Sequence, residues 1–165
     1  AVAPPTPVFQ NIEKLSGDCL SVPAFAVYRS LVPFGAAYQN IVGDVSVSKE
    51  GALAYLSGGA GDADDSLLGS PFVMDAAMHA ACVWGQRFCD VVAFPAGFAQ
   101  RTVYAPTRKG GSYLGRIVPV TFSRQLLEFD IWIFDEQGVL CERIVSLQMR
   151  DVTRGRMRPP AWIKE

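Results

Sequence analysis

Asp75 and His79 are the residues whose types and spacing could do chemistry in this chain. They are four apart in a stretch that predicts a helix, so they share one face and lie within reach of each other. His79 is the only histidine among the 165 residues. An acid and an imidazole on an apolar helix wall are costly to bury without a partner or a purpose. The pair is therefore either a structural one, whose members satisfy each other and the backbone, or a candidate catalytic centre suited to proton transfer.

The helix that carries the pair has a recognisable start. Ser70 suits the N-cap, because its hydroxyl can accept a bond from a free N–H of the first turn. Pro71 suits the first helical position, where its missing N–H costs nothing. From Pro71 to about Phe88 the residues are mostly apolar, which predicts a core helix. Burial raises the pKa of Asp75, whereas the dipole of the helix N-terminus lowers it.

Length and composition indicate one domain with a substantial core. Half of the residues are hydrophobic, 19% are charged, and the net charge is −1. The lack of a basic block argues against nucleic acid or a membrane surface as a partner. No segment has the roughly 18 consecutive apolar residues that span a bilayer, and the first residues lack the pattern of a signal peptide.

The cysteines and aspartates show no metal-ligand spacing, so we expect no metal site. The cysteines form no CxxC pair and have no second histidine to complete a zinc set. We expect reduced thiols in a cytoplasmic protein. The acidic loop at 57–66 lacks the glutamate of an EF-hand and predicts a solvated loop. The residues concerned are Cys19, Cys82, Cys89 and Cys141, and Asp62, Asp64 and Asp65.

Alternating and β-rich stretches predict a series of antiparallel strands. They cover residues 41–48, 52–56, 91–96, 100–104, 112–121, 128–134 and 139–152. Gly138 closes a hairpin turn at a position that needs positive φ. A curved antiparallel sheet around one long helix is the α+β hot-dog fold. We expect a lead-in at 1–23, weakly helical or irregular from residue 9, a single hot-dog domain at 24–152 and a C-terminal tail at 153–165.

Three segments, in order, give the chain a family resemblance. Residues 34–39 (Phe-Gly-Ala-Ala-Tyr-Gln) resemble a Tyr-Gly-Pro-x-Phe-Gln segment. Residues 70–79 resemble a His-Pro-x-x-Leu-Asp-x-x-x-Gln/His segment, and residues 94–150 follow the same family's order and spacing. Over about residues 27–152, the chain resembles the C-terminal hot-dog half of a polyketide synthase dehydratase domain.

The resemblance implies a lyase that eliminates water from a β-hydroxyacyl thioester. The substrate is carried on the phosphopantetheine arm of an acyl carrier protein, and the resemblance implies no other cofactor. Carried over, Asp75 protonates the leaving hydroxyl and His79 helps to orient the aspartate or the hydroxyl. The partners implied are the carrier protein and a second hot-dog domain, in cis, in trans or as a homodimer. The substrate-binding residues implied are Phe34, Gly35, Tyr38, Met78, Phe94 and Pro95.

The sequence departs from the family at two points. Phe34 and Ala36 stand where the family has tyrosine and proline, so a hydroxyl is lost. The family's base motif, His-x-x-x-Gly-x-x-x-x-Pro, is absent, because Val83 follows His79 where glycine would stand. We therefore expect the base histidine to come from another hot-dog domain. The alternatives are a homodimeric dehydratase or thioesterase that uses His79 or Asp75, and a non-catalytic acyl-binding or scaffold module.

A carrier protein is acidic, so its docking surface should be basic. The candidates are Arg101, Arg108, Lys109, Arg116 and Arg124.

Overall fold

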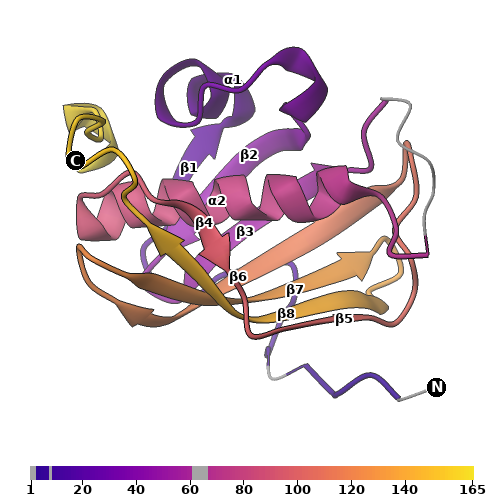
Figure 1. The fold of residues 1–165 in the computed structure, drawn as a ribbon. Helices are drawn as coiled ribbons and strands as arrows, with labels where there is room; N and C mark the ends of the chain where they lie inside the picture. Colours follow the sequence, from indigo (N-terminus) through magenta and orange to yellow (C-terminus); the bar gives the residue numbers. More distant parts are fainter. Residues whose placement is uncertain (1–2, 8, 61–66) are drawn as a thin grey trace.

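One long helix lies across a curved antiparallel sheet (Figure 1), which confirms the α+β hot-dog architecture. The computed structural model describes residues 3–7, 9–60 and 67–165, so Asp62, Asp64 and Asp65 lie outside it. The sheet order is β1-β2-β3-β6-β7-β8-β4, and β5 also pairs with β8. The strands are β1 (Leu20–Pro23), β2 (Ile41–Ser48), β3 (Gly51–Ser57), β4 (Phe94–Gly97), β5 (Gln100–Val103), β6 (Ser112–Phe122), β7 (Leu127–Asp135) and β8 (Leu140–Arg150).

The central helix α2 (Pro71–Cys89) is capped as the sequence predicted. The Ser70 hydroxyl accepts a hydrogen bond from the Phe72 N–H at 3.3 Å and donates one to the Gly58 carbonyl at 2.7 Å. The C-cap residue is Asp90, whose φ of 55° is left-handed. Alanines cover much of the buried face, so the helix can approach the sheet closely. These contacts fix the position of the helix that carries Asp75 and His79.

The sheet is buried on both faces near its middle, which explains the nearly continuous apolar run of β7. Phe129, Ile131 and Ile133 belong to the core beneath α2. Trp132 and Phe134, which point the other way, belong to a second cluster on the outer face. Because side chains alternate across a strand, burial of both faces removes the polar half of the usual alternation.

The N-terminal residues, expected to be weakly helical or irregular from residue 9, cover that outer face. Leu20–Pro23 form β1, which pairs with β2. The Phe9 ring packs edge-on against Trp132 and lies under the Arg116 guanidinium. The C-terminal tail also packs on the domain, through the short helix η3 (Ala161–Ile163). Ile163 is fully buried, and Arg87 donates a hydrogen bond to its carbonyl at 2.8 Å.

Three short helical segments precede β2 and form one wall above α2 (Figure 1). They are α1 (Ala24–Ala26), η1 (Val27–Leu31) and η2 (Ala36–Tyr38). Across the described parts of the chain, no helix is long and apolar enough to cross a membrane.

Candidate active site

Asp75 and His79 face each other one turn apart on α2. Nε2 of His79 lies 3.2 Å from Oδ2 of Asp75. The two atoms are close enough for an ion pair, but their angles are not those of a hydrogen bond, and both are buried without another partner among the described residues. The Asp75 side chain is 35% exposed, and its exposed part cannot be the buried Oδ2. Oδ1 is therefore the oxygen that is left to meet a substrate.

His79 is enclosed by two aromatic rings. The Phe34 ring stacks on the imidazole, with centroids 4.9 Å apart and planes at 15°. Tyr28, from η1, meets the imidazole edge-on, and its hydroxyl oxygen lies 3.2 Å from Nδ1. His79 is only 4% exposed. The imidazole is thus enclosed by the protein, with Nδ1 beside the Tyr28 hydroxyl and Nε2 facing Asp75.

Burial moves the two pKa values in opposite directions. It raises the pKa of Asp75 to about 6 and lowers the pKa of His79 to about 4. Asp75 lies in the second turn of α2, beyond the first turn where the helix dipole acts most strongly. Burial therefore has a larger effect on the pKa of Asp75 than the helix dipole has. The result is a neutral imidazole beside a carboxyl that still holds its proton in mildly acidic solution.

The pair opens into an apolar cavity of about 240 Å³. Six of the eight predicted site residues line it, and they come from α2, from β4 and from the turn after η1. Cavities with apolar walls and a few placed polar groups are typical of small-molecule sites. The predicted residues brought together here are Phe34, Asp75, Met78, His79, Phe94 and Pro95.

Gly35 and Tyr38 do not line the cavity. Gly35 precedes η2 at its N-cap. The half-exposed Tyr38 ring packs against the rings of Phe34 and Phe72, at 6.3 and 5.8 Å. These two residues support the wall that carries Phe34. We therefore assign them to the site only as supports of the Phe34 ring.

Sequence reasoning missed several residues of the site, and four of them carry polar or sulfur atoms. Cys82, Met149 and Met157 line the cavity, and the Tyr28 hydroxyl contacts Nδ1 of His79. Cys82 follows His79 on the helix face that the Asp75 spacing already marked, so its position was a usable signal. The other three reach the site only through the tertiary fold, and no local pattern marks them.

Two of the arginines expected at a docking surface are not available for one. Arg116 is 1% exposed, lies over the Phe9 ring and donates to a Glu50 carboxylate oxygen at 2.7 Å. Arg101 pairs with the fully buried Glu142 and also donates to the Leu68 carbonyl at 3.0 Å. The prediction that Arg101 and Arg116 form a docking surface is wrong, because the sequence does not show which face of a strand is covered.

The cysteines are free thiols, two of them buried, one half-buried, and Cys19 exposed. Burial raises the pKa of Cys82 to about 11, so its thiol stays protonated at neutral pH. Among the residues that the structure describes, no group of three His, Cys, Asp or Glu side chains could hold a metal ion.

One protein-family model matches most of the chain. Residues 10–159 match the family model described as the polyketide synthase dehydratase N-terminal domain. The motifs at 34–39 and 70–79 predict the C-terminal half of a dehydratase domain, whereas this model describes the N-terminal domain. The match therefore shows the family and does not assign the half. A comparison with curated proteins finds no significant match.

Solved dehydratase domains share the fold at low sequence identity. The dehydratase domain of RzxB from Pseudomonas fluorescens is 21% identical, with a TM-score of 0.62 over 80% of this chain and 50% of that one. The dehydratase domain of PpsC from Mycobacterium tuberculosis is 22% identical, with a TM-score of 0.60 over 84% and 55%. The dehydratase domain from the CurJ module of the curacin polyketide synthase is 16% identical, with a TM-score of 0.63 over 79% and 48%.

The chain spans about half the length of these solved domains. Its long central helix and curved antiparallel sheet match the hot-dog fold that they contain. With the family match over most of its length, the chain belongs to the polyketide synthase dehydratase family.

Proposed function

We propose that this chain is the acid-bearing half of a dehydratase that acts on β-hydroxyacyl thioesters carried by an acyl carrier protein. The observation that carries the proposal is the Asp75 carboxyl, which is partly exposed at an apolar cavity while its inner oxygen lies 3.2 Å from Nε2 of His79. Within the family the chain belongs to, one solved structure is the PpsC dehydratase domain in complex with C12:1-CoA. An acyl thioester is thus a ligand of that protein.

The reaction needs one acid and one base. A base removes the proton from the α-carbon, the electron pair forms the Cα=Cβ double bond, and the C–O bond at the β-carbon breaks. Asp75 donates a proton to the departing oxygen, which leaves as water. Two protons move and no electron acceptor is needed, so the substrate's phosphopantetheine arm is the only prosthetic group we assign. The apolar cavity holds the acyl chain and keeps bulk water from the acid.

The base comes from a second hot-dog domain. The chain has one histidine, and both ring nitrogens of His79 face protein atoms, Tyr28 Oη and Asp75 Oδ2. This buried imidazole is poorly placed to take a proton from a substrate, which disfavours the alternative in which His79 is itself the base. One solved neighbour is an inactive CurJ dehydratase mutant in which histidine is replaced by phenylalanine.

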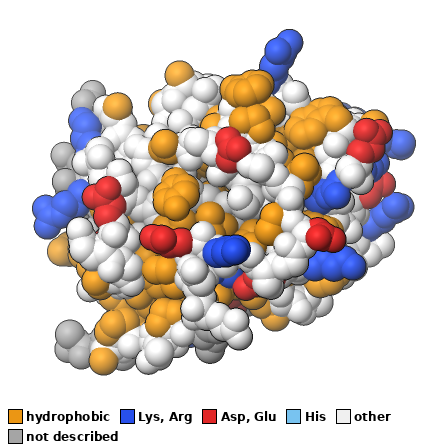
Figure 2. All heavy atoms as spheres, turned by 180° about the vertical axis from the view of Figure 1, so that it is seen from behind, with side chains coloured by type: hydrophobic (Ala, Val, Ile, Leu, Met, Phe, Trp, Pro, Cys, Tyr) orange, Lys and Arg blue, Asp and Glu red, His pale blue; other side chains and the backbone are white. Residues whose placement is uncertain are grey.

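We assign the chain to the C-terminal, acid-bearing half. The support is the aspartate on the central helix and the lack of a His-x-x-x-Gly-x-x-x-x-Pro motif. A partner domain would also cover exposed apolar side chains such as Phe25, Val42 and Tyr55. Apolar side chains reach the surface between charged ones on the rear face of the molecule (Figure 2). Free thiols fit the reduced cytoplasm in which we place the protein.

The test combines the chain with a hot-dog half that bears the histidine motif. We expect the enoyl product from a 3-hydroxybutyryl-pantetheine thioester, detected by mass spectrometry, only when both halves are present. A partner whose motif histidine is replaced by phenylalanine is the matched control. Turnover by the isolated chain would instead support the homodimer that uses His79, and binding without turnover with any partner would support an acyl-binding module.

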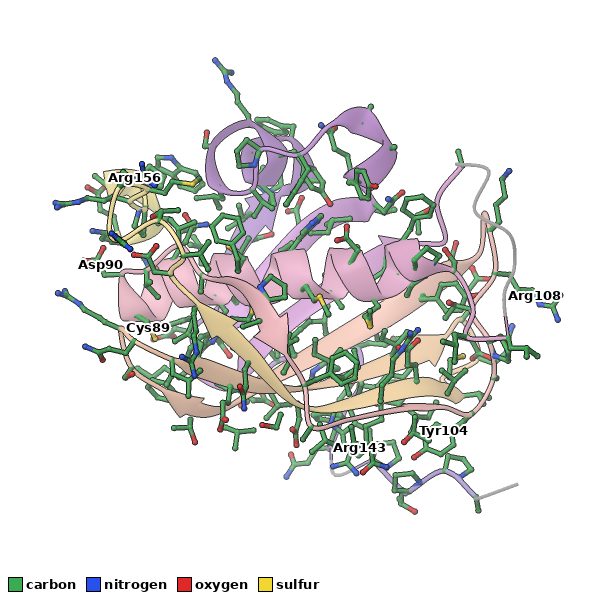
Figure 3. The ribbon with its side chains drawn as sticks, viewed as in Figure 1. Cys89, Asp90, Tyr104, Arg108, Arg143 and Arg156 are labelled. Atoms are coloured by element: carbon green, nitrogen blue, oxygen red, sulfur yellow. The ribbon has the colours of Figure 1, made fainter. Side chains whose placement is uncertain are left out.

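The carrier protein docks at the C-terminal arginines beside the cavity. Residues 150–158 contain four exposed arginines and one aspartate, and Met157 among them lines the cavity. Figure 3 shows Arg156 at the end of α2 that holds Cys89 and Asp90, whereas Arg108 lies at the opposite end of the molecule. Through Met157 the arginine segment reaches the cavity from the Asp90 end of α2, whereas Arg108 follows Thr107, which bonds Ser70 at the other end of that helix.

Neutralising this segment should weaken recognition of the carrier but spare the chemistry. We expect the combined substitutions Arg154→Gln, Arg156→Gln and Arg158→Gln to raise KM for a carrier-bound substrate about 10-fold, because rim charges steer association. KM for the pantetheine thioester should stay unchanged. The control combines Lys14→Gln, Lys49→Gln and Arg108→Gln, which remove the same charge elsewhere. Equal effects of both triple variants would show that only net charge matters.

A further inference from the structure

Tyr28 is a buried residue to which the reaction just described gives no role. It lies on η1 and is 8% exposed. The Ile41 N–H donates to the hydroxyl oxygen at 3.0 Å. The same oxygen lies 3.2 Å from Nδ1 of His79. An amide N–H can only donate, so the oxygen is the acceptor there, and among the described residues Nδ1 is the acceptor within reach of the hydroxyl proton.

A neutral imidazole that accepts at Nδ1 carries its proton on Nε2. That nitrogen faces Oδ2 of Asp75 at 3.2 Å. Burial supports these protonation states, since it lowers the pKa of His79 to about 4 and raises the pKa of Tyr28 to about 12. The direction of donation therefore runs from Ile41 to Tyr28 and from Tyr28 to His79, which leaves the protonated Nε2 of His79 facing Oδ2 of Asp75.

The tautomer of His79 decides which oxygen of Asp75 holds the acid proton. With a proton on Nε2, a second proton on Oδ2 would face it at 3.2 Å, so the carboxyl proton sits on Oδ1, the oxygen left to face the cavity. With the other tautomer, the bare Nε2 would attract the carboxyl proton to Oδ2, which is buried and turned from a substrate.

We propose that Tyr28 is a positioning residue that holds His79 in the Nε2–H tautomer and so keeps the Asp75 proton on the oxygen that faces the substrate. The consequence for catalysis rests on the proposed function, but the tautomer itself can be observed without any turnover.

The experiment is ¹⁵N NMR of the chain labelled at histidine. Because His79 is the only histidine, its two ring nitrogens give an unambiguous pair of signals, and the protonated one is identified by its coupling to hydrogen. We expect a proton on Nε2 and a bare Nδ1 in the wild type near pH 7. In Tyr28→Phe we expect a substantial Nδ1–H population, and in Tyr55→Phe, which removes a half-exposed hydroxyl on β3, no change.

In the complex with a histidine-bearing half, Tyr28→Phe should lower kcat about 10-fold, the equivalent of one hydrogen bond, with KM little changed. A wild-type spectrum with the proton on Nδ1, or an unchanged tautomer in Tyr28→Phe, would overturn the proposal. If Tyr28→Phe does not fold, the wild-type spectrum alone still decides. The expected tautomers without turnover in any complex would refute the proposed function and leave the Tyr28–His79 contact established.

Discussion

Replacing Asp75 by asparagine should lower kcat for dehydration about 10²–10⁴-fold, the contribution of a well-placed proton donor. Asparagine keeps the size of the side chain and an oxygen that can face Nε2 of His79, but its amide is not acidic enough to protonate the leaving hydroxyl. Ground-state binding should survive, so KM should change little. The measurement is the initial rate of enoyl formation by the complex of this chain with a histidine-bearing half.

The pH profile adds a second signature of the same group. The pKa of Asp75 is about 6 in the isolated chain, and cover by a partner domain would raise it further. The acid is active when protonated, so the rate should fall as pH rises above that pKa. The residual rate of Asp75→Asn should lack this falling limb.

A matched variant separates loss of the acid from loss of any carboxylate. Asp18 is exposed and does not line the cavity, so Asp18→Asn should keep the wild-type rate and pH profile. Circular dichroism would check that both variants are folded. If Asp75→Asn kept more than a tenth of the wild-type rate, another group would have to be the acid.

Much of the fold was predictable because its signals are local. The Ser70-Pro71 start and the apolar run predicted α2 within one residue of its end at Cys89. Alternation predicted β2 and the hairpin between β7 and β8, where Asp135 Oδ1 accepts from the Gln137 and Val139 N–H groups at 2.9 Å. The expected strand at 91–96 was shifted, because Val91 to Ala93 are buried without pairing and β4 begins at Phe94.

The site was predictable only where it depends on spacing within one helix. Asp75 and His79 meet because they are four apart on α2. Tyr28 meets His79 across 51 residues of sequence, and that contact exists only after η1 has packed over the helix. Arg116 shows the same limit, because the N-terminal segment that buries it lies about 100 residues away. Contacts of this kind depend on packing between elements, which periodicity does not encode.

The largest effect on stability is expected from Trp84→Ala. Trp84 is 2% exposed on α2 and packs against the rings of Phe88, Phe122 and Phe129 at 5.0–5.6 Å. Its indole N–H donates to the Ser48 carbonyl at the end of β2, at 2.9 Å. The substitution should lower the free energy of unfolding by about 3–5 kcal/mol, since it leaves a cavity in the core. It also removes the hydrogen bond that the indole N–H donates to the Ser48 carbonyl.

Thermal unfolding would show this loss as a Tm lower by about 10 °C, given the size of the chain. Trp162→Ala is the matched control, because Trp162 is 41% exposed on η3, and it should cost less than about 1 kcal/mol. Trp84→Phe should lie between the two, since it keeps most of the ring packing and loses only the bond to β2. A Trp84→Ala chain as stable as Trp162→Ala would mean that α2 is held on the sheet mainly by its alanine face. The position of Asp75 would then depend on that close approach and not on the aromatic cluster.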